Sequence, residues 1–200
     1  MIKCNVTVIG TVNRPVELKN GRDGNPFVTF GLNVLLKDNQ ESKNIDISVA
    51  SDGDDDTVLS LSKGDRVRLK GVLSFKRICD TLYFNLSTDE LSLNPKGADT
   101  IIGEIQFRGT LGSKEIVEKM GKKGAFRTFD AYSSEKIGEQ QYSYIWVHFI
   151  DFSDETPDWL GPKAKIEVDG KLELQIFKGS PSINCRVESL SEWVKEDLNR

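Results

Sequence analysis

The chain has 200 residues, enough for one large domain or for two domains of about 100 residues each. Its 38% hydrophobic and 29% charged residues are typical of a soluble globular protein, and no apolar run approaches the ~20 residues that span a bilayer. The net charge of −4 argues against a generally basic protein, although a local cationic groove is enough to attract a polyanion.

The start of the chain and its cysteines indicate the compartment. The first residues, MIKCNVTVIGTV, lack an apolar stretch ending in small residues, so we expect no signal peptide. Cys4, Cys79 and Cys185 are too few and too scattered for a disulfide framework or a zinc knuckle. We therefore expect a cytoplasmic protein that needs no metal and no cofactor.

Strand-forming runs dominate the first half of the chain. They are VTVIGTV (6–12), FVTFGLNVLL (27–36), NIDISVAS (44–51), DRVRLKGVLSF (65–75) and LYFNLSTDELSL (82–93). Between the third and fourth runs, Asp55 or Asp56 is placed to cap a short helix that ends at Gly64.

The second half repeats this order. Its runs are EIQFRGTL (104–111), FRTFDAYS (126–133), YSYIWVHFI (142–150), KIEVDGKLELQIF (165–177) and SINCRVESL (182–190), with DETPDWLGP (154–162) between the third and fourth. The pattern of residues 63–75 returns at 162–174, 99 positions later, and the same offset relates the first strands and the last. We predict two copies of one domain, at 1–95 and 100–194, joined by NPKGAD.

Five strands with a helical turn between the third and fourth is the order of an OB-fold. Gly71 and Gly170 lie in mid-strand, where small barrels bend. We predict an all-β protein of two tandem OB-folds, each a five-stranded Greek-key barrel with a short helix between strands 3 and 4. A small β-sandwich is the alternative.

The fourth strand of the first copy carries a cationic stripe. Alternation turns its apolar residues inward and leaves Arg66, Arg68, Lys70 and Lys76 outside, where they suit phosphates. A solvated face paired with neighbouring acids is the other interpretation. The matching residues in 165–171 are of mixed charge, so no phosphate track is expected there.

The second copy is richer in outward aromatic rings. Alternation places these outside: Phe126, Tyr132, Tyr144 and Trp146. Exposed rings on a barrel sheet stack on unpaired bases, each worth about 1–3 kcal/mol, although they equally suit an interface with the first copy or a second subunit. Phe27 is the matching ring of the first copy, or covers a barrel end. Lys122 and Lys123 either contact a phosphate or form a hairpin tip.

Catalytic motifs are missing. The single histidine, His148, allows neither a repeated His-based dyad nor a histidine metal cluster. The acidic run at 51–56 lacks the glycine and the final glutamate of a calcium loop, and no P-loop occurs. We expect a protein that is not an enzyme, with no catalytic and no metal-binding residues.

Short motifs follow in a fixed order along the first copy. They are Gly10, Pro15, Thr29-Phe30, Lys63-Gly64, Val67-x-Leu69-x-Gly71-x-Leu73 and Asp89-Glu90-Leu91. In order and spacing they resemble the bacterial single-stranded DNA-binding protein (SSB) family. The resemblance covers the first copy well, and the second copy only through the internal repeat.

Two departures from the family pattern affect the predicted site. The family usually places a stacking Trp after the mid-strand glycine, where the first copy has Ile78 beside Lys76 and Arg77 and the second copy has Phe177. The family's third strand begins with an aromatic residue, which Ile45 replaces in the first copy. The predicted nucleic-acid contacts are Arg66, Arg68, Lys70, Lys76, Arg77, Phe27, Phe126, Tyr132, Tyr144, Trp146, Phe177, Lys122 and Lys123.

The resemblance implies non-catalytic binding of single-stranded DNA with little sequence preference, in DNA replication, recombination or repair. It also implies a homodimer with four OB-folds, and a tandem form without a tail would suit a phage or mobile element. The end, ESLSEWVKEDLNR, is unlike the family's acidic tail, so recruitment of replication or repair proteins through it is not expected. A protein-interaction or oligomerisation module and an RNA-binding OB protein are the alternatives.

Overall fold

The computed structural model describes residues 1–21, 23–38, 41–52, 56–114, 116–121, 124–136, 139, 141–153 and 155–194. The chain divides into two compact units. Residues 3–103 and 174–181 belong to one, and residues 1–2, 104–173 and those from 182 onward belong to the other. Within the described residues, no helix is long and apolar enough to cross a membrane.

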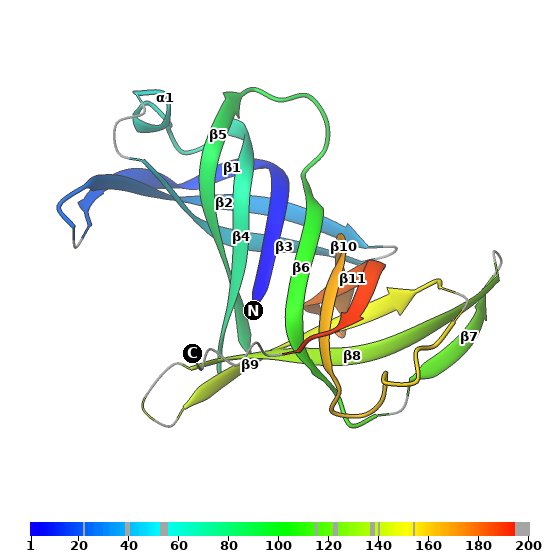
Figure 1. Cartoon of the computed structure of the whole chain (residues 1–200). Coiled ribbons are helices and arrows are strands. Elements are labelled where there is room, and N and C mark those ends of the chain that lie inside the picture. The colour runs from blue at the N-terminus through cyan, green and yellow to red at the C-terminus, as the bar shows by residue number, and fades with distance from the viewer. Residues whose placement is uncertain are drawn as a thin grey trace. The chain divides into compact units, whose positions relative to one another are not determined.

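The first five strands close into a barrel, which we call the first barrel (Figure 1). Its strands are ordered β2-β3-β5-β4-β1, and β1 pairs again with β2; β3 and β5 are parallel and the other described pairs antiparallel. This is the closed order of an OB-fold. The elements are β1 (Ile2–Asn20), β2 (Pro26–Asp38), β3 (Glu41–Asp52), α1 (Asp56–Leu59), β4 (Arg66–Ile78) and β5 (Thr81–Leu93).

The remaining strands form the second barrel with the same order. It runs β6-β10-β11-β9-β8, β6 pairs again with β8, and β9 and β11 are parallel. A short strand that the sequence did not predict, β7, pairs with β8 and corresponds to the far half of the long β1. The elements are β6 (Thr100–Leu111), β7 (Val117–Gly121), β8 (Gly124–Lys136), β9 (Tyr142–Asp151), β10 (Lys165–Phe177) and β11 (Ser180–Glu192).

The barrel interiors are filled by the apolar residues that alternate along each strand. Val67, Leu69 and Leu73 on β4 are completely buried, as are Ile166 and Val168 on β10. A mid-strand glycine on each of β4 and β10 lies against a backbone carbonyl of the next strand, at a place that a Cβ atom would overlap. The sequence predicted the alternation and a bend at the mid-strand glycine, and the pairing of β4 with β5 has an irregularity between Lys70 and Gly71.

The two predicted helices have different outcomes. α1 forms after β3 and buries Val58. The matching connection after β9 has turns and no helix among its described residues, so the second predicted helix is wrong. Pro157 and Pro162 lack the backbone N–H that a helix needs, and Gly161 disfavours one; Leu160 is buried there instead.

The repeat offset is 99 in four of the five barrel strands and 100 in the third. Phe30 on β2 lies opposite Val49, whereas Phe129, 99 positions later, lies opposite Phe149. The second barrel has one more residue than the first between β8 and β9, and one fewer between β9 and β10, so the offset returns to 99. Ile45 of the first barrel therefore matches Ile145, and both are buried.

Candidate nucleic-acid interface

Three aromatic side chains gather on the outer face of β8 and β9. The ring centroids of Tyr132 and Trp146 are 4.9 Å apart, and those of Tyr132 and Tyr144 are 5.6 Å apart. Tyr144 and Trp146 are each 47% exposed although they lie in the middle of a paired strand. We call this outer surface, from Tyr144 to Phe152 along β9 with the facing residues of β8, the ring face.

Gly112, just after β6, makes room for the indole of Trp146. A Cβ atom at this position would lie 3.2 Å from Trp146 Cζ3 and 3.1 Å from the carbonyl oxygen of Asp130. Both distances are tighter than ordinary van der Waals contact. The glycine therefore allows the indole to lie close to the backbone while its other side stays open to solvent.

A hydrogen-bonded pair of side chains lies in the middle of the ring face. His148 Nδ1 is 2.7 Å from Asp130 Oδ1. The hydrogen bond from His148 holds the pKa of Asp130 below its ordinary value, against the opposing effect of burial, and Lys114 and Lys119 act in the same direction. Asp130 is thus a hydrogen-bonded carboxylate with two lysines in its surroundings.

The far end of the ring face carries a second group of rings. Phe126 on β8 and Phe152, directly after β9, have centroids 5.5 Å apart, and the Arg186 guanidinium lies 5.2 Å from the Phe152 centroid. Phe152 and Arg186 were not predicted from the sequence as site residues. The outward positions 144, 146, 148 and 150 continue to 152, so the period of two was the signal that could have found Phe152.

Two other predicted rings, Phe177 and Phe27, lie apart from the ring cluster. Phe177 is 64% exposed near the β10–β11 turn, where Lys178 Nζ lies 5.3 Å from its ring centroid. Phe27 is half-buried and lies opposite Asp52. Lys122 and Lys123 lie outside the described residues.

Two of the four side chains of the cationic stripe on β4 pair with acids. Arg66 pairs with Asp99 at 2.6 Å and donates to the carbonyl of Gly97, and Lys70 pairs with Glu90 at 2.7 Å. Arg68 and Lys76 are exposed, and no acid pairs with either in the described part of the chain. Arg77 donates to the carbonyl oxygen of Cys79 at 3.3 Å.

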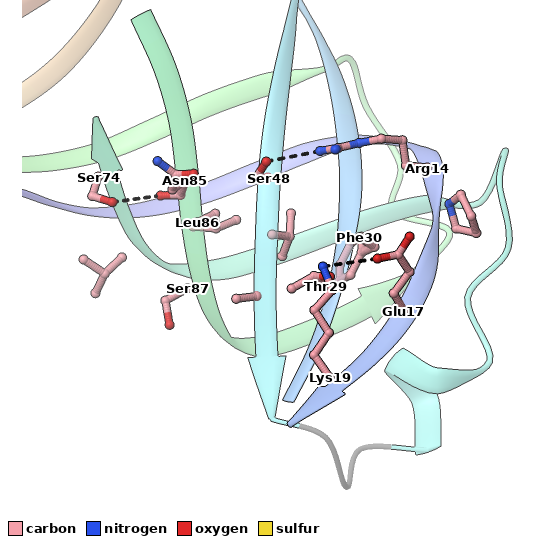
Figure 2. A pocket seen from close by; sticks show the side chains of 14 residues that line it. Arg14, Glu17, Lys19, Thr29, Phe30, Ser48, Ser74, Asn85, Leu86 and Ser87 are labelled. Carbon is pink, nitrogen blue, oxygen red and sulfur yellow. Dashed lines mark hydrogen bonds and ion pairs between the residues drawn. The ribbon is translucent and has the colours of Figure 1, made fainter. Parts of the chain in front are cut away.

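The first barrel also has a polar groove of about 460 Å³ (Figure 2). Buried Phe30, Val49 and Leu86 lie beneath it, and hydroxyl and amide groups line its walls. The Arg14 guanidinium reaches across it to Ser48 Oγ at 3.1 Å. The lining has hydrogen-bonding groups but no exposed ring, unlike the ring face.

Comparisons with known proteins place the fold. No family model matches the sequence, and no curated protein matches it either. The wild-type single-stranded DNA-binding protein from Thermus aquaticus has 12% sequence identity and a TM-score of 0.50, with 96% of this chain and 93% of that chain covered. The chain has the fold of this DNA-binding protein. A small single-stranded DNA-binding protein from Streptomyces coelicolor aligns with 47% of this chain and 91% of its own, at 18% identity and a TM-score of 0.37.

This fold is the one that the SSB resemblance of the sequence implied. The all-β, OB-fold prediction is confirmed, and the β-sandwich alternative is excluded by the closed strand order of each barrel. Within the described residues, no group of three or more metal-ligating side chains occurs.

Proposed function

We propose that the protein binds single-stranded DNA without catalysis and with little sequence preference, by stacking bases on the ring face. The observation that carries this proposal is the ring cluster on a barrel strand face, in which exposed Tyr144 and Trp146 pack on half-buried Tyr132. Every base has a π-face, so stacking on such rings is tolerant of sequence. Phe126 and Phe152 extend the stacking surface, and Phe27 and Phe177 are secondary contacts.

Cations beside the rings supply the phosphate contacts. Lys114, Lys119 and Arg186 lie on or near the ring face, and Arg68 and Lys76 are the exposed cations of β4. Neutralising backbone phosphates releases counterions, so affinity should fall as salt rises. The net charge of −4 does not oppose this, because the local charge near the strand path decides.

We further propose that residues 1–95 and 100–194 are two copies of one OB-fold and that a homodimer brings together four of them. The cellular setting that fits such a protein is the cytoplasm, in DNA replication, recombination or repair.

The first test is a fluorescence titration with oligo(dT) of about 35 nucleotides, at low salt and at about 0.3 M salt. Trp146 is the exposed tryptophan, whereas Trp159 and Trp193 are half-buried, so stacking should quench Trp146 emission. Trp146→Phe is the matched control, since it keeps a ring but should lose most of the quenching while a labelled oligonucleotide still binds.

Two outcomes bear on the proposal. Quenching that weakens with salt supports it, and competition with RNA of equal length tests the RNA-binding alternative through the 2′-hydroxyl. Unchanged fluorescence and unchanged oligonucleotide mobility at both salt concentrations would refute it and favour a protein-interaction module.

A further inference from the structure

The first barrel has a different set of side chains at the positions of the ring face. Asn33 on β2 lies opposite Asp46 on β3, as Tyr132 lies opposite Trp146 in the second barrel. A neighbouring position on the first strand of each barrel differs too. Asn13 on β1 stands where the second barrel has a glycine at position 112.

Asp46 accepts hydrogen bonds from the side-chain amides of both Asn13 and Asn33. Asn13 Nδ2 donates to Asp46 Oδ1 at 2.7 Å, and Asn33 Nδ2 donates to the same oxygen at 3.0 Å. We call these three residues the amide–carboxylate trio. Asn13 thus carries a side chain at the position where Gly112, which has none, leaves room for the indole of Trp146.

Apart from half-buried Phe27, which matches Phe126, the rest of this face is polar as well. The positions that match Tyr144, His148 and Phe152 are polar or acidic in the first barrel, namely Asn44, Ser48 and Asp52. None of them has a π-face, and the carboxylates of Asp46 and Asp52 repel phosphate. Arg14, beside the trio, is bonded to Ser48.

A comparison of the two halves of the sequence at a constant offset of 99 does not reveal the difference between the two faces, because that offset pairs Tyr144 with Ile45. Ile45 is a barrel-core residue that is 3% exposed, and its true counterpart is Ile145. The register of β3 and β9 is what brings Asp46 and Trp146 into correspondence.

We propose that each chain offers one base-stacking barrel: the ring face of the second barrel holds the bases, and the amide–carboxylate trio keeps them off the matching face of the first. The inference rests on the proposed binding of single-stranded DNA and says which repeat performs it. DNA that crosses the first barrel then does so mainly through phosphate contacts, such as those of Arg68 and Lys76, and not through stacking at the trio positions of β2 and β3; half-buried Phe27 stays a secondary contact.

Matched alanine substitutions in the full chain test the inference, with a labelled oligo(dT) read by fluorescence anisotropy. Tyr132→Ala and Trp146→Ala should each weaken binding roughly 5- to 150-fold. Asn33→Ala and Asp46→Ala, at the equivalent positions of the first barrel, should leave binding within about twofold or tighten it, because they remove no ring. Circular dichroism checks that each variant remains folded.

A second experiment moves the stacking residues from the second barrel to the first; we call the resulting variant the transplant. In the Tyr132→Ala/Trp146→Ala chain, Asn13→Gly, Asn33→Tyr and Asp46→Trp together should restore binding, since they rebuild the stacking group on the first barrel. A folded transplant that does not bind would overturn the role given to the trio; if the transplant does not fold, the alanine pairs decide.

The outcomes separate this inference from the proposed function. If the unsubstituted chain binds no oligo(dT), the proposed function itself fails. If it binds and Asn33→Ala or Asp46→Ala weakens binding as much as the ring substitutions, the single-barrel inference is wrong while the proposed function survives.

Discussion

A buried ion pair next to the end of the ring face gives the sharpest stability prediction. The side chains of Arg127 and Asp151 are 5% and 4% exposed, and Arg127 Nη2 and Nε lie 2.6 and 2.9 Å from Asp151 Oδ2. Arg127 also donates to Ser153 Oγ, to the Glu155 carbonyl and to Thr156 Oγ1. The guanidinium therefore fastens the connection after β9 to the start of β8.

Replacing Arg127 with methionine leaves Asp151 buried without its partner. Removing one member of a buried pair costs about 3–5 kcal/mol, which for a chain of this size is a loss of roughly 6–20 °C in melting temperature. Because Phe126 and Phe152 adjoin the pair, we also expect weaker oligonucleotide binding, by less than the loss in Trp146→Ala. Urea unfolding followed by circular dichroism measures the first effect.

The control is the double variant Arg127→Met/Asp151→Leu, which removes both charges. It should recover much of the lost free energy of unfolding, since replacing a whole buried pair with apolar groups is often neutral. A single Arg127→Met variant that costs less than about 1 kcal/mol would contradict the reasoning, because such a value is typical of a solvent-exposed pair.

Three further predictions follow from single side chains. Arg68→Ala should lower the salt slope of oligonucleotide binding by about 0.7, the value for one phosphate on a single strand, and an unchanged slope would remove Arg68 from the strand path. The lowered pKa of Asp130 means that its contribution to stability is present above its ordinary pKa of 3.8 and is lost as pH falls through the lower folded value. Acid titration of the free energy of unfolding should show this loss in the parent chain and a smaller one in Asp130→Asn; equal losses would mean that the hydrogen bond to His148 is not the cause. Burial raises the pKa of Cys185 to about 12, so a thiol reagent at pH 8 should label exposed Cys79 and leave Cys185 unmodified until the protein is unfolded. Labelling of Cys185 in the folded protein would show that the second barrel opens under those conditions.

The sequence was sufficient for the barrel strands other than β7 and for the central rings of the ring face. Strand alternation has a strict period of two, so Tyr144 and Trp146 were placed outside and Val147 and Phe149 inside, as the structure has them. The internal repeat of the sequence allowed the strands of the second barrel to be predicted from those of the first. These are local or strictly periodic signals, which need no knowledge of partners.

Other features depend on partners that are distant in sequence. A shift of one residue reverses every side chain of a strand, and only the pairing with β2 and β8 reveals that the third strands differ by such a shift. Likewise, alternation placed Arg66 outside but gave no sign of Asp99, which lies 33 residues away and neutralises it. The cationic stripe was therefore predicted as more open than it is.

The parallel pairing of β3 with β5 has a consequence for synthesis of the chain. β5 is the last strand of the first barrel to be made, yet its residues Phe84 to Ser87 complete the edge of β3. Until then, β3 presents unpaired backbone groups, the kind of edge at which strands of different molecules associate. The same holds for β9 until β11 emerges. Chains that end prematurely at about residue 80 should therefore aggregate, whereas chains that extend past β5 should not.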